Sequence, residues 1–202
     1  MSVAESKVRK TRCAQEFQRW IDANCVVLDT ETTGLRGIDE IVEISVIDAA
    51  GHTVLDTLVR PSCEIPIEAT KIHGITDEMV AGAPTWLDIH DQVIEALTGR
   101  VVVIYNAAFD VRLLLQTARI NGATETQLAE LDSVLRDNVK CAMLLYAEFF
   151  GYWDDYRENY RWVRLSSAAA NEDVKIEGQA HRALADVKTT LGIMRAVASA
   201  HV

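Results

Sequence analysis

An apolar run that ends in two acids constrains the fold more than any other feature of this sequence. The run reads VVLDTETTG over residues 26–34 and has the length and β-branched content of a buried strand. Because side chains alternate along a strand, Asp29 and Glu31 point to one face, whereas Leu28 and Thr30 point to the other. Neighbouring carboxylates raise each other's pKa unless a positive group lies between them, and a divalent cation is the usual one. The segment predicts a metal site, with an exposed strand end as the alternative.

The length and composition are those of a globular protein with one core. The 202 residues include 49% hydrophobic and 25% charged side chains. We expect a helical N-terminal extension over residues 1–23 and a single domain over residues 24–202. No apolar run reaches the ~18 residues that a membrane helix needs, and the polar start lacks the apolar core of a signal peptide. These features predict a cytoplasmic protein without a membrane partner.

The net charge of −10 argues against a broadly basic surface, but it allows a local basic path to an acidic site. The cysteines lack CxxC spacing, which favours buried thiols over a zinc site or disulfides. Three histidines have no motif around them and are expected at the surface. The four cysteines are Cys13, Cys25, Cys63 and Cys141, and the three histidines are His52, His90 and His201.

Apolar periodicity and turn residues predict an α/β fold, in which a strand hairpin precedes alternating strands and helices. Thr85 and Asp88 resemble a capping box at the start of a helix that ends at Gly99. Residues 50–52 are expected to form the turn of the hairpin. We expect strands over 25–31, 40–48, 53–60 and 101–105, a short strand and a helix within 134–150, and helices over 11–22, 85–98, 107–120, 165–171 and 182–199.

Two further acids and a histidine follow in the second half of the chain. The stretch YNAAFD (105–110) places Asp110 in the first turn of the helix after a buried strand, where α/β sheets build their sites. In HRALAD (181–186), His181 and Asp186 would lie about 140° apart on a regular helix. We therefore predict that His181 lies on a loop and that the helix starts at about Arg182. Taken alone, Asp110 and Asp186 would be acids favoured by a helix dipole.

Together these motifs resemble those of the DEDDh 3′–5′ exonucleases, a DnaQ-like family with an RNase H-like fold. DTETTG resembles the first motif of that family, NAAFD the second and HRALAD the third. IHGIT (72–76) resembles a segment between the first two, and the resemblance covers about residues 24–196. It implies a mixed five-stranded sheet flanked by helices, and an enzyme that hydrolyses phosphodiester bonds.

The resemblance also implies a mechanism and its catalytic residues. Asp29, Glu31 and Asp186 would hold one Mg²⁺ or Mn²⁺, and Asp29 with Asp110 would help hold a second ion across the scissile phosphate. His181 would take the proton from the attacking water. The product would be a nucleoside 5′-monophosphate released from the 3′ end of a strand.

A further set of residues is expected at the terminal nucleotide, because they lie in or beside the family motifs. Leu35 would offer an apolar face to the base. For His73, contact with the nucleotide and a purely local turn beside Gly74 both remain open. The expected substrate-binding set is Thr30, Thr32, Thr33, Gly34, Leu35, His73, Asn106 and Phe109.

Two positions depart from the family pattern, and one segment has no counterpart in its motifs. Tyr105 stands where many relatives have histidine, and residues 140–141 read Lys-Cys where Asp-Thr is frequent. Neither change removes a metal ligand, so both bear on substrate preference. The segment YWDDYRENYRWVR (152–164) suits stacking on single-stranded nucleic acid. Its acids would repel phosphates, so we favour a helix that packs on the core or on a second subunit.

The leading interpretation is an exonuclease that trims the 3′ end of single-stranded DNA in proofreading, repair or end processing. RNA is the alternative substrate, since one sequence does not reveal a contact to the 2′-hydroxyl. A non-catalytic nucleic-acid-binding module is the alternative from another class. The sequence leaves a homodimer open, and no tail of the kind that binds a polymerase is evident.

Overall fold

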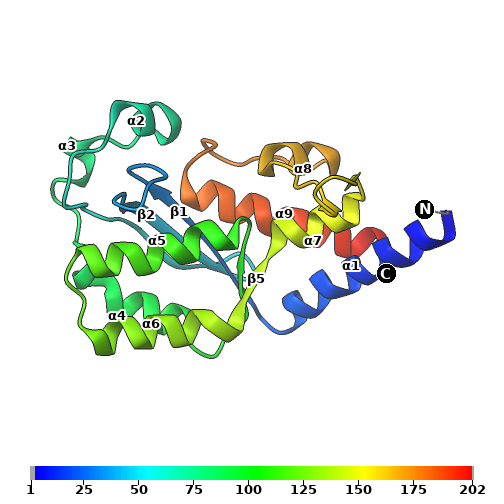
Figure 1. The fold of residues 1–202 in the computed structure, drawn as a ribbon, viewed down its shortest axis with the longest axis horizontal. Helices are drawn as coiled ribbons and strands as arrows, with labels where there is room; N and C mark the ends of the chain where they lie inside the picture. Colours follow the sequence, from blue (N-terminus) through cyan, green and yellow to red (C-terminus); the bar gives the residue numbers. More distant parts are fainter. Residues whose placement is uncertain (1–2, 202) are drawn as a thin grey trace.

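The computed structural model describes residues 3–201, apart from the side chains at positions 3, 137 and 201. It shows a mixed five-stranded sheet in the order β3-β2-β1-β4-β5, flanked by helices (Figure 1). The strands of this sheet are β1 (Val26–Thr32), β2 (Ile41–Asp48), β3 (Thr53–Leu58), β4 (Val102–Ile104) and β5 (Val139–Cys141). The expected α/β fold is confirmed.

The helices connect the strands and cover the sheet. They are α1 (Val3–Asp22), α2 (Ile67–His73), α3 (Asp77–Val80), α4 (Trp86–Leu97), α5 (Ala107–Ile120), α6 (Glu125–Asn138), α7 (Ala142–Phe150), α8 (Leu165–Asn171) and α9 (Ala183–His201). A separate hairpin consists of β6 (Trp153–Asp154) and β7 (Asn159–Tyr160).

Strand β1 lies at the centre of the sheet, antiparallel to β2 and parallel to β4. Its pairing with β2 slips by one residue between Glu31 and Thr32, directly after the register pair Glu31 and Glu43. Such bulges re-aim side chains and are frequent beside active sites. The end of β1 that carries the acids is therefore an irregular point in an otherwise regular ladder.

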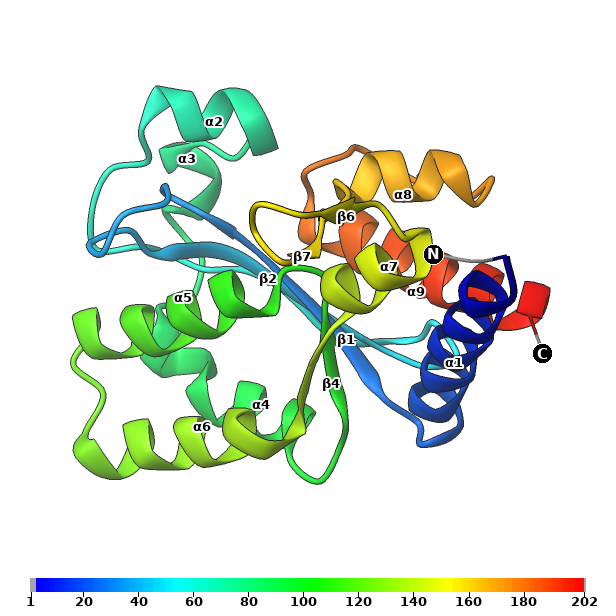
Figure 2. The ribbon, with the colours of Figure 1, turned by 45° about the vertical axis from the view of Figure 1, so that its right-hand side comes forward.

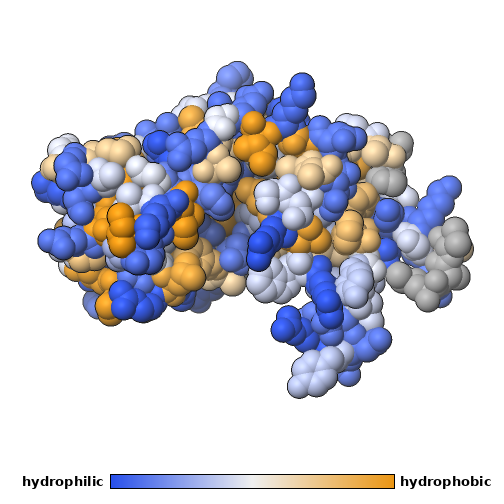
Figure 3. Space-filling model, turned by 90° about the horizontal axis from the view of Figure 1, so that it is seen from above, coloured by the Kyte–Doolittle hydropathy of each residue, from blue (hydrophilic) through white to orange (hydrophobic). Residues whose placement is uncertain are grey.

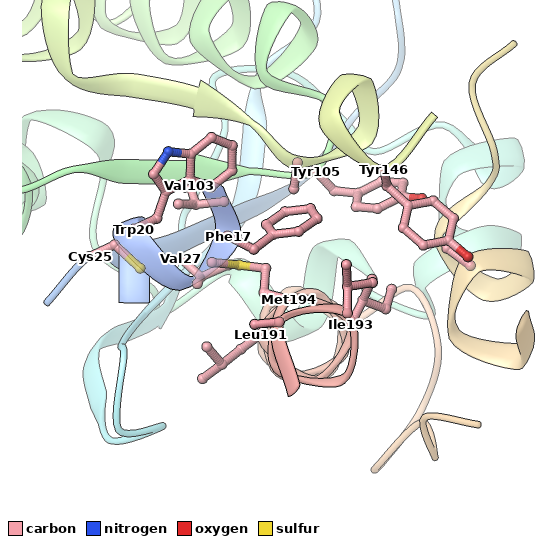
Figure 4. Close-up of a cluster of buried hydrophobic side chains, with 14 of the residues drawn as sticks. Phe17, Trp20, Cys25, Val27, Val103, Tyr105, Tyr146, Leu191, Ile193 and Met194 are labelled. Carbon is pink, nitrogen blue, oxygen red and sulfur yellow. The ribbon is translucent and has the colours of Figure 1, made fainter. Parts of the chain in front are cut away.

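Helices lie on both faces of the sheet, as Figures 1 and 2 show from two directions. One core forms where α1, α7 and α9 meet the sheet, and Figure 4 shows Phe17 of α1, Val27 of β1 and Met194 of α9 in it. A second core contains Leu28 of β1 with Trp86 of α4, and a smaller third one contains Ile75 and Val80. Because Val27 and Leu28 enter opposite cores, the alternation along β1 continues through Asp29 and Thr30.

Most expected elements are confirmed, including the turn with Gly51 at φ 97° and the capping box in which the Thr85 N–H and hydroxyl donate to Asp88. Helix α1 begins eight residues before the expected start at residue 11. Helices α2, α3 and α6 were not expected, because short or weakly apolar segments give little periodic signal. Residues 152–164 form a hairpin and its flanks, so the helix favoured for this segment is wrong.

Two surface and burial expectations are wrong. Cys63 is exposed, whereas Cys13 and Cys25 are buried as expected. His90 is fully buried, because its place on α4 faces the core beside Trp86, with ring centroids 6.2 Å apart. The side chain of His201 lies outside the described residues. Among helices within residues 3–201, none combines the length and the apolarity that crossing a lipid bilayer requires.

Candidate active site

Three carboxylates converge at the end of β1. One oxygen each from Asp29, Glu31 and Asp186 lies within 4.8 Å of the other two. Asp29 and Glu31 come from alternate positions of β1, and Asp186 comes from the first turn of α9, which packs on β1 and β2. The shared face that the strand alternation predicts is therefore present.

Asp110 reaches the same region from the other face of β1. It lies in the first turn of α5 and is buried, and its Oδ1 accepts a hydrogen bond of 2.7 Å from the Thr30 hydroxyl. Thr30 points away from Asp29, so β1 positions acids on both of its faces. Asp110 is not a member of the group of three, although its charge raises the pKa of Asp29.

The electrostatics of this cluster are unfavourable for ionised carboxylates. Burial, followed by the charges of Asp110, Glu31 and Asp186, holds the pKa of Asp29 well above its ordinary value. Burial and the charge of Asp186 raise the pKa of Glu31 to about 8. Burial likewise raises the pKa of Asp110 to about 7, and the hydrogen bond from Thr30 opposes this rise. A group of positive charge would relieve all these shifts at once.

His181 lies directly before α9, as predicted, with a left-handed backbone at φ 60°. Its side chain is exposed, and a backbone hydrogen bond from His181 lowers the pKa of Asp186 against the larger effect of burial. The helix starts at Ala183, one residue after the expected position. Because α9 begins between the two residues, the angle of a regular helix does not separate His181 from Asp186.

Glu43 of β2 fixes the start of α9. Its carboxylate accepts hydrogen bonds from Arg182 at 2.5, 3.0 and 3.1 Å and from the Ala183 N–H at 2.8 Å. The Glu43 side chain is 5% exposed. It acts as the N-terminal cap of α9 and holds the segment between His181 and Asp186.

Sequence reasoning missed Glu43 and Arg182 as parts of the site. The available signal was Glu43 itself, an acid in the middle of the apolar strand EIVEISVID. The structure buries Glu43 and the residues on either side of it. Buried acids are rare without a partner. The strand pattern could therefore have indicated a buried carboxylate in need of a cation, although not which one.

The loop after β1 is held by the residues that the sequence assigned to substrate. Thr33 accepts a hydrogen bond of 2.9 Å from the Glu40 N–H, and Thr32 donates to the Gly34 carbonyl at 2.8 Å. A Cβ at Gly34 would meet the Asp39 carboxylate at 2.7 Å, so a larger residue here would displace that side chain. The Thr30, Thr32 and Thr33 side chains are buried. Their hydroxyls order the site from inside.

Leu35 is the member of the expected set that the loop presents to solvent, with 77% of its surface exposed. Arg112 of α5 holds the loop by donating to the carbonyls of Leu35 and Arg36 at 3.2 and 3.4 Å. Phe109 is half-buried one turn earlier, beneath the Arg112 guanidinium at 5.2 Å. Exposure of the apolar Leu35 side chain to water is unfavourable, and a ligand that covers this side chain would remove that cost.

His73 connects α2 to the end of β1. The side chain is buried, its Nδ1 accepts a hydrogen bond of 3.0 Å from the Ile75 N–H, and its Nε2 lies 3.3 Å from the Thr32 carbonyl. The Nε2 atom must therefore carry the proton and donate. Burial lowers the pKa of His73, which favours this neutral form. The local turn beside Gly74, one of the two alternatives for His73, is therefore present.

Tyr105 and Asn106 connect β4 to α5, the helix that carries Asp110. Asn106 is exposed and precedes α5 without a side-chain cap. Tyr105 is buried, and its hydroxyl donates to the Val163 carbonyl at 2.8 Å. The residue that departs from the family pattern therefore anchors the chain that follows the β6–β7 hairpin.

The sheet order and the carboxylate cluster define a nuclease of the RNase H-like class, and comparison with known proteins gives the family. Residues 26–194 match the RNase_T family, which is described as exonuclease. The chain belongs to this exonuclease family and is of the DnaQ-like DEDDh type. Family membership implies the use of a divalent metal ion.

Curated relatives include proteins of phage and bacteria. The chain is 48% identical over 185 residues to an uncharacterized exonuclease, CP81, of Escherichia phage 186, and the match covers 92% of this chain and 93% of the relative. It is 30% identical over 182 residues to the PolC-type DNA polymerase III of Caldanaerobacter subterraneus, covering 88% of this chain and 12% of that protein. The chain therefore matches the whole of one relative and a small part of the other.

Solved structures share the fold. Exonuclease X in complex with 5′ overhanging duplex DNA has a TM-score of 0.61 and 26% identity, covering 87% of this chain and 92% of that one. An E. coli ExoI complex with single-stranded DNA has a TM-score of 0.70 and 15% identity, covering 88% and 41%. The second likeness concerns the fold alone.

The residues at the end of β1 suit a divalent cation. Asp29, Glu31 and Asp186 supply carboxylate oxygens, which are the ligands that Mg²⁺ and Mn²⁺ prefer. Burial and the charges of neighbouring acids raise the pKa values of Asp29 and Glu31, and the charge of Arg182 only partly offsets the rise for Glu31. Neither cysteine nor histidine belongs to the group, so soft metals are disfavoured.

Proposed function

We propose that this exonuclease is a metal-dependent enzyme that acts on the 3′ end of single-stranded DNA and releases nucleoside 5′-monophosphates. The convergence of Asp29, Glu31 and Asp186 within 4.8 Å carries the proposal. Relatives named as DNA polymerase III proteins, among them the epsilon subunit of Rickettsia conorii, support DNA as the substrate.

Two ions of Mg²⁺ or Mn²⁺ would supply activation of water and neutralise charge on the phosphoryl group. Asp29, Glu31 and Asp186 would hold one ion, and Asp29 with Asp110 would hold the second. Thr30 fixes the rotamer of Asp110 through its hydrogen bond. In this way one face of β1 supplies Asp29 and the other face positions Asp110. Glu43 keeps the start of α9 in place beside them.

His181 accepts a proton from the attacking water in this proposal. Its exposed position before α9 lets the ring approach and leave the reacting atoms without moving the helix. Leu35 covers the terminal base from the loop after β1, and Asn106 lies at the start of α5 where it can contact the strand. We assign the remaining members of the expected set to ordering these groups.

The test uses a 5′-labelled single-stranded DNA oligomer and its RNA counterpart with Mg²⁺ or Mn²⁺. We expect a ladder that shortens from the 3′ end and is absent in EDTA and in the Asp186→Asn variant. Asp91→Asn on the exposed face of α4 is the matched control and should retain the ladder. Chromatography of the products should give nucleoside 5′-monophosphates.

The ratio of the cleavage rates of the DNA and RNA oligomers decides between the two substrates. Faster cleavage of RNA than of DNA would replace the DNA assignment by an exoribonuclease with the same chemistry. If the enzyme binds both oligomers but cleaves neither of them with Mg²⁺ or with Mn²⁺, the catalytic proposal is overturned and a binding module is favoured.

A further inference from the structure

The segment from residue 152 to 164, here called the arm, contains a hairpin that the carboxylate site does not use. Strands β6 and β7 pair Trp153 with Tyr160, whose rings meet edge to face at 5.0 Å. The turn between the strands has Glu158 in a left-handed conformation at φ 51°. In Figure 3 a lobe projects from the body of the molecule at the position that this hairpin has in Figures 1 and 2.

The acid nearest the arm's arginines is occupied inside the hairpin. Asp154 is 9% exposed, accepts hydrogen bonds from the backbone N–H groups of Tyr156 and Arg157, and pairs with Arg161 at 2.9 Å. Its negative charge therefore stabilises the turn and is partly neutralised by Arg161, although Asp154 also lines the hollow described below. The repulsion of phosphates by Asp154 is reduced accordingly, whereas Asp155 and Glu158 remain exposed.

The arm presents cations that the chain itself does not neutralise. Arg157 and Arg164 are exposed, and neither forms an ion pair within the described part of the chain. An open hollow of about 560 Å³ is lined by both and by Arg161. In a protein of net charge −10, free guanidinium groups around one hollow are a local exception.

Aromatic faces accompany these cations. Trp162 is 60% exposed and Tyr156 is 95% exposed, and both line the same hollow. A second hollow shares Arg161, Trp162 and Arg164, so these three residues form a ridge between two depressions. Alternating guanidinium groups and rings match the alternating phosphates and bases of a single strand.

The base of the arm is fixed to the edge of the sheet that carries the catalytic acids. The Tyr105 hydroxyl donates to the carbonyl of Val163, and Tyr105 precedes the α5 turn that contains Asp110. At the other side, Arg9 of α1 lies 5.3 Å above the Tyr160 ring. The ridge is therefore held at a defined place relative to the carboxylate cluster.

We propose that the arm binds single-stranded nucleic acid on the 5′ side of the nucleotide being removed, with Arg157 and Arg164 contacting phosphates and Trp162 stacking on a base. This proposal rests on the proposed function, because it places the strand's 3′ end at the carboxylates. It predicts that long oligomers bind more tightly than a dinucleotide, which we expect not to reach the arm.

The test measures binding in an Asp186→Asn background, so that cleavage does not interfere. The double variant Arg157→Ala with Arg164→Ala is compared with Arg119→Ala with Arg136→Ala, which removes the same charge from α5 and α6. We expect the arm pair to make the slope of log affinity against log salt less steep by about 1.4, since each phosphate contact on a single strand contributes about 0.7. The control pair should leave the slope unchanged.

Trp162→Ala should weaken binding of the long oligomer about tenfold, as expected for the loss of one stacked base. Dinucleotide binding should change far less. Thermal unfolding midpoints near that of the parent protein would show that the variants fold.

Equal affinities and slopes for the arm and control pairs would overturn the proposal. Conversion of a dimer to a monomer by the arm variants, with oligomer binding intact, would also overturn it and assign the ridge to a second copy. Failure of the wild-type enzyme to cleave either the long oligomer or the dinucleotide would instead refute the proposed function, whatever the arm variants bind.

Discussion

Replacing Glu43 tests whether a buried ion pair sets the geometry of the catalytic segment. Glu43→Gln removes the charge that Arg182 and the α9 N-terminus share, at a side chain that is 5% exposed. Breaking a fully buried pair costs about 3–5 kcal/mol. Because Arg182 is 33% exposed and regains water, we expect a loss near the lower limit, about 3 kcal/mol, in the free energy of unfolding.

For a chain of this size the loss lowers the melting temperature by about 6–12 °C. Urea unfolding gives the free energy, and Glu148→Gln is the matched control, since Glu148 pairs with Arg12 at the surface and should cost about 1 kcal/mol or less. Single-turnover cleavage should fall about a hundredfold, because His181 and Asp186 flank the released segment.

The double variant Glu43→Gln with Arg182→Gln provides the decisive comparison. If the two residues stabilise α9 as a pair, the double variant loses less than the sum of the two single variants. Additive losses, or a loss for Glu43→Gln no larger than for Glu148→Gln, would refute the reasoning.

Three further predictions concern the carboxylates and the loop beside them. In EDTA, the free energy of unfolding should fall as pH rises from about 4.5 towards the Glu31 pKa of about 8, because the folded state retains a proton that the unfolded state has lost. Urea unfolding across this window checks the trend, Mg²⁺ should oppose it, and a rising curve would contradict it. Thr30→Val should destabilise by about 1–3 kcal/mol and raise the pKa of Asp110, measurable by urea unfolding and by carboxyl NMR titration. Leu35→Ser should leave stability within about 0.5 kcal/mol but raise KM for an oligomer, and an unchanged KM would exclude the leucine from the substrate site.

The central part of the site could be predicted because it depends on local rules. Strand alternation places Asp29 and Glu31 on one face, and the helical angle between His181 and Asp186 requires a break before α9. Neither conclusion needs knowledge of distant contacts. Both follow from the regular repeat of a strand or a helix, which relates spacing in the sequence to direction in space.

The pair Glu43–Arg182 could not be predicted in the same way, because 139 residues separate the partners. The early start of α1 has a similar cause. Its first turns are polar, and they are held by tertiary contacts such as Arg9 with Tyr160 and Lys10 with Phe149. Packing of this kind overrides local propensity.

Helix α6 was missed for a different reason. Leu128, Leu131 and Leu135 have helical spacing, and Thr124 with Gln127 forms a capping box. The signal was therefore present in the sequence, but its apolar stripe is narrow among polar residues. The omission affects the outer layer and not the site.

The position of α9 has a consequence for the protein during synthesis. The strands and the acids at positions 29, 31 and 110 leave the ribosome before α9, which carries the final acid and covers the same face of the sheet as α1. Until α9 docks, a nascent chain exposes the apolar face that Phe17 and Val27 share and has an incomplete carboxylate cluster. A chain that lacks α9 also lacks Asp186, so under the proposed function we expect it to be inactive as a nuclease.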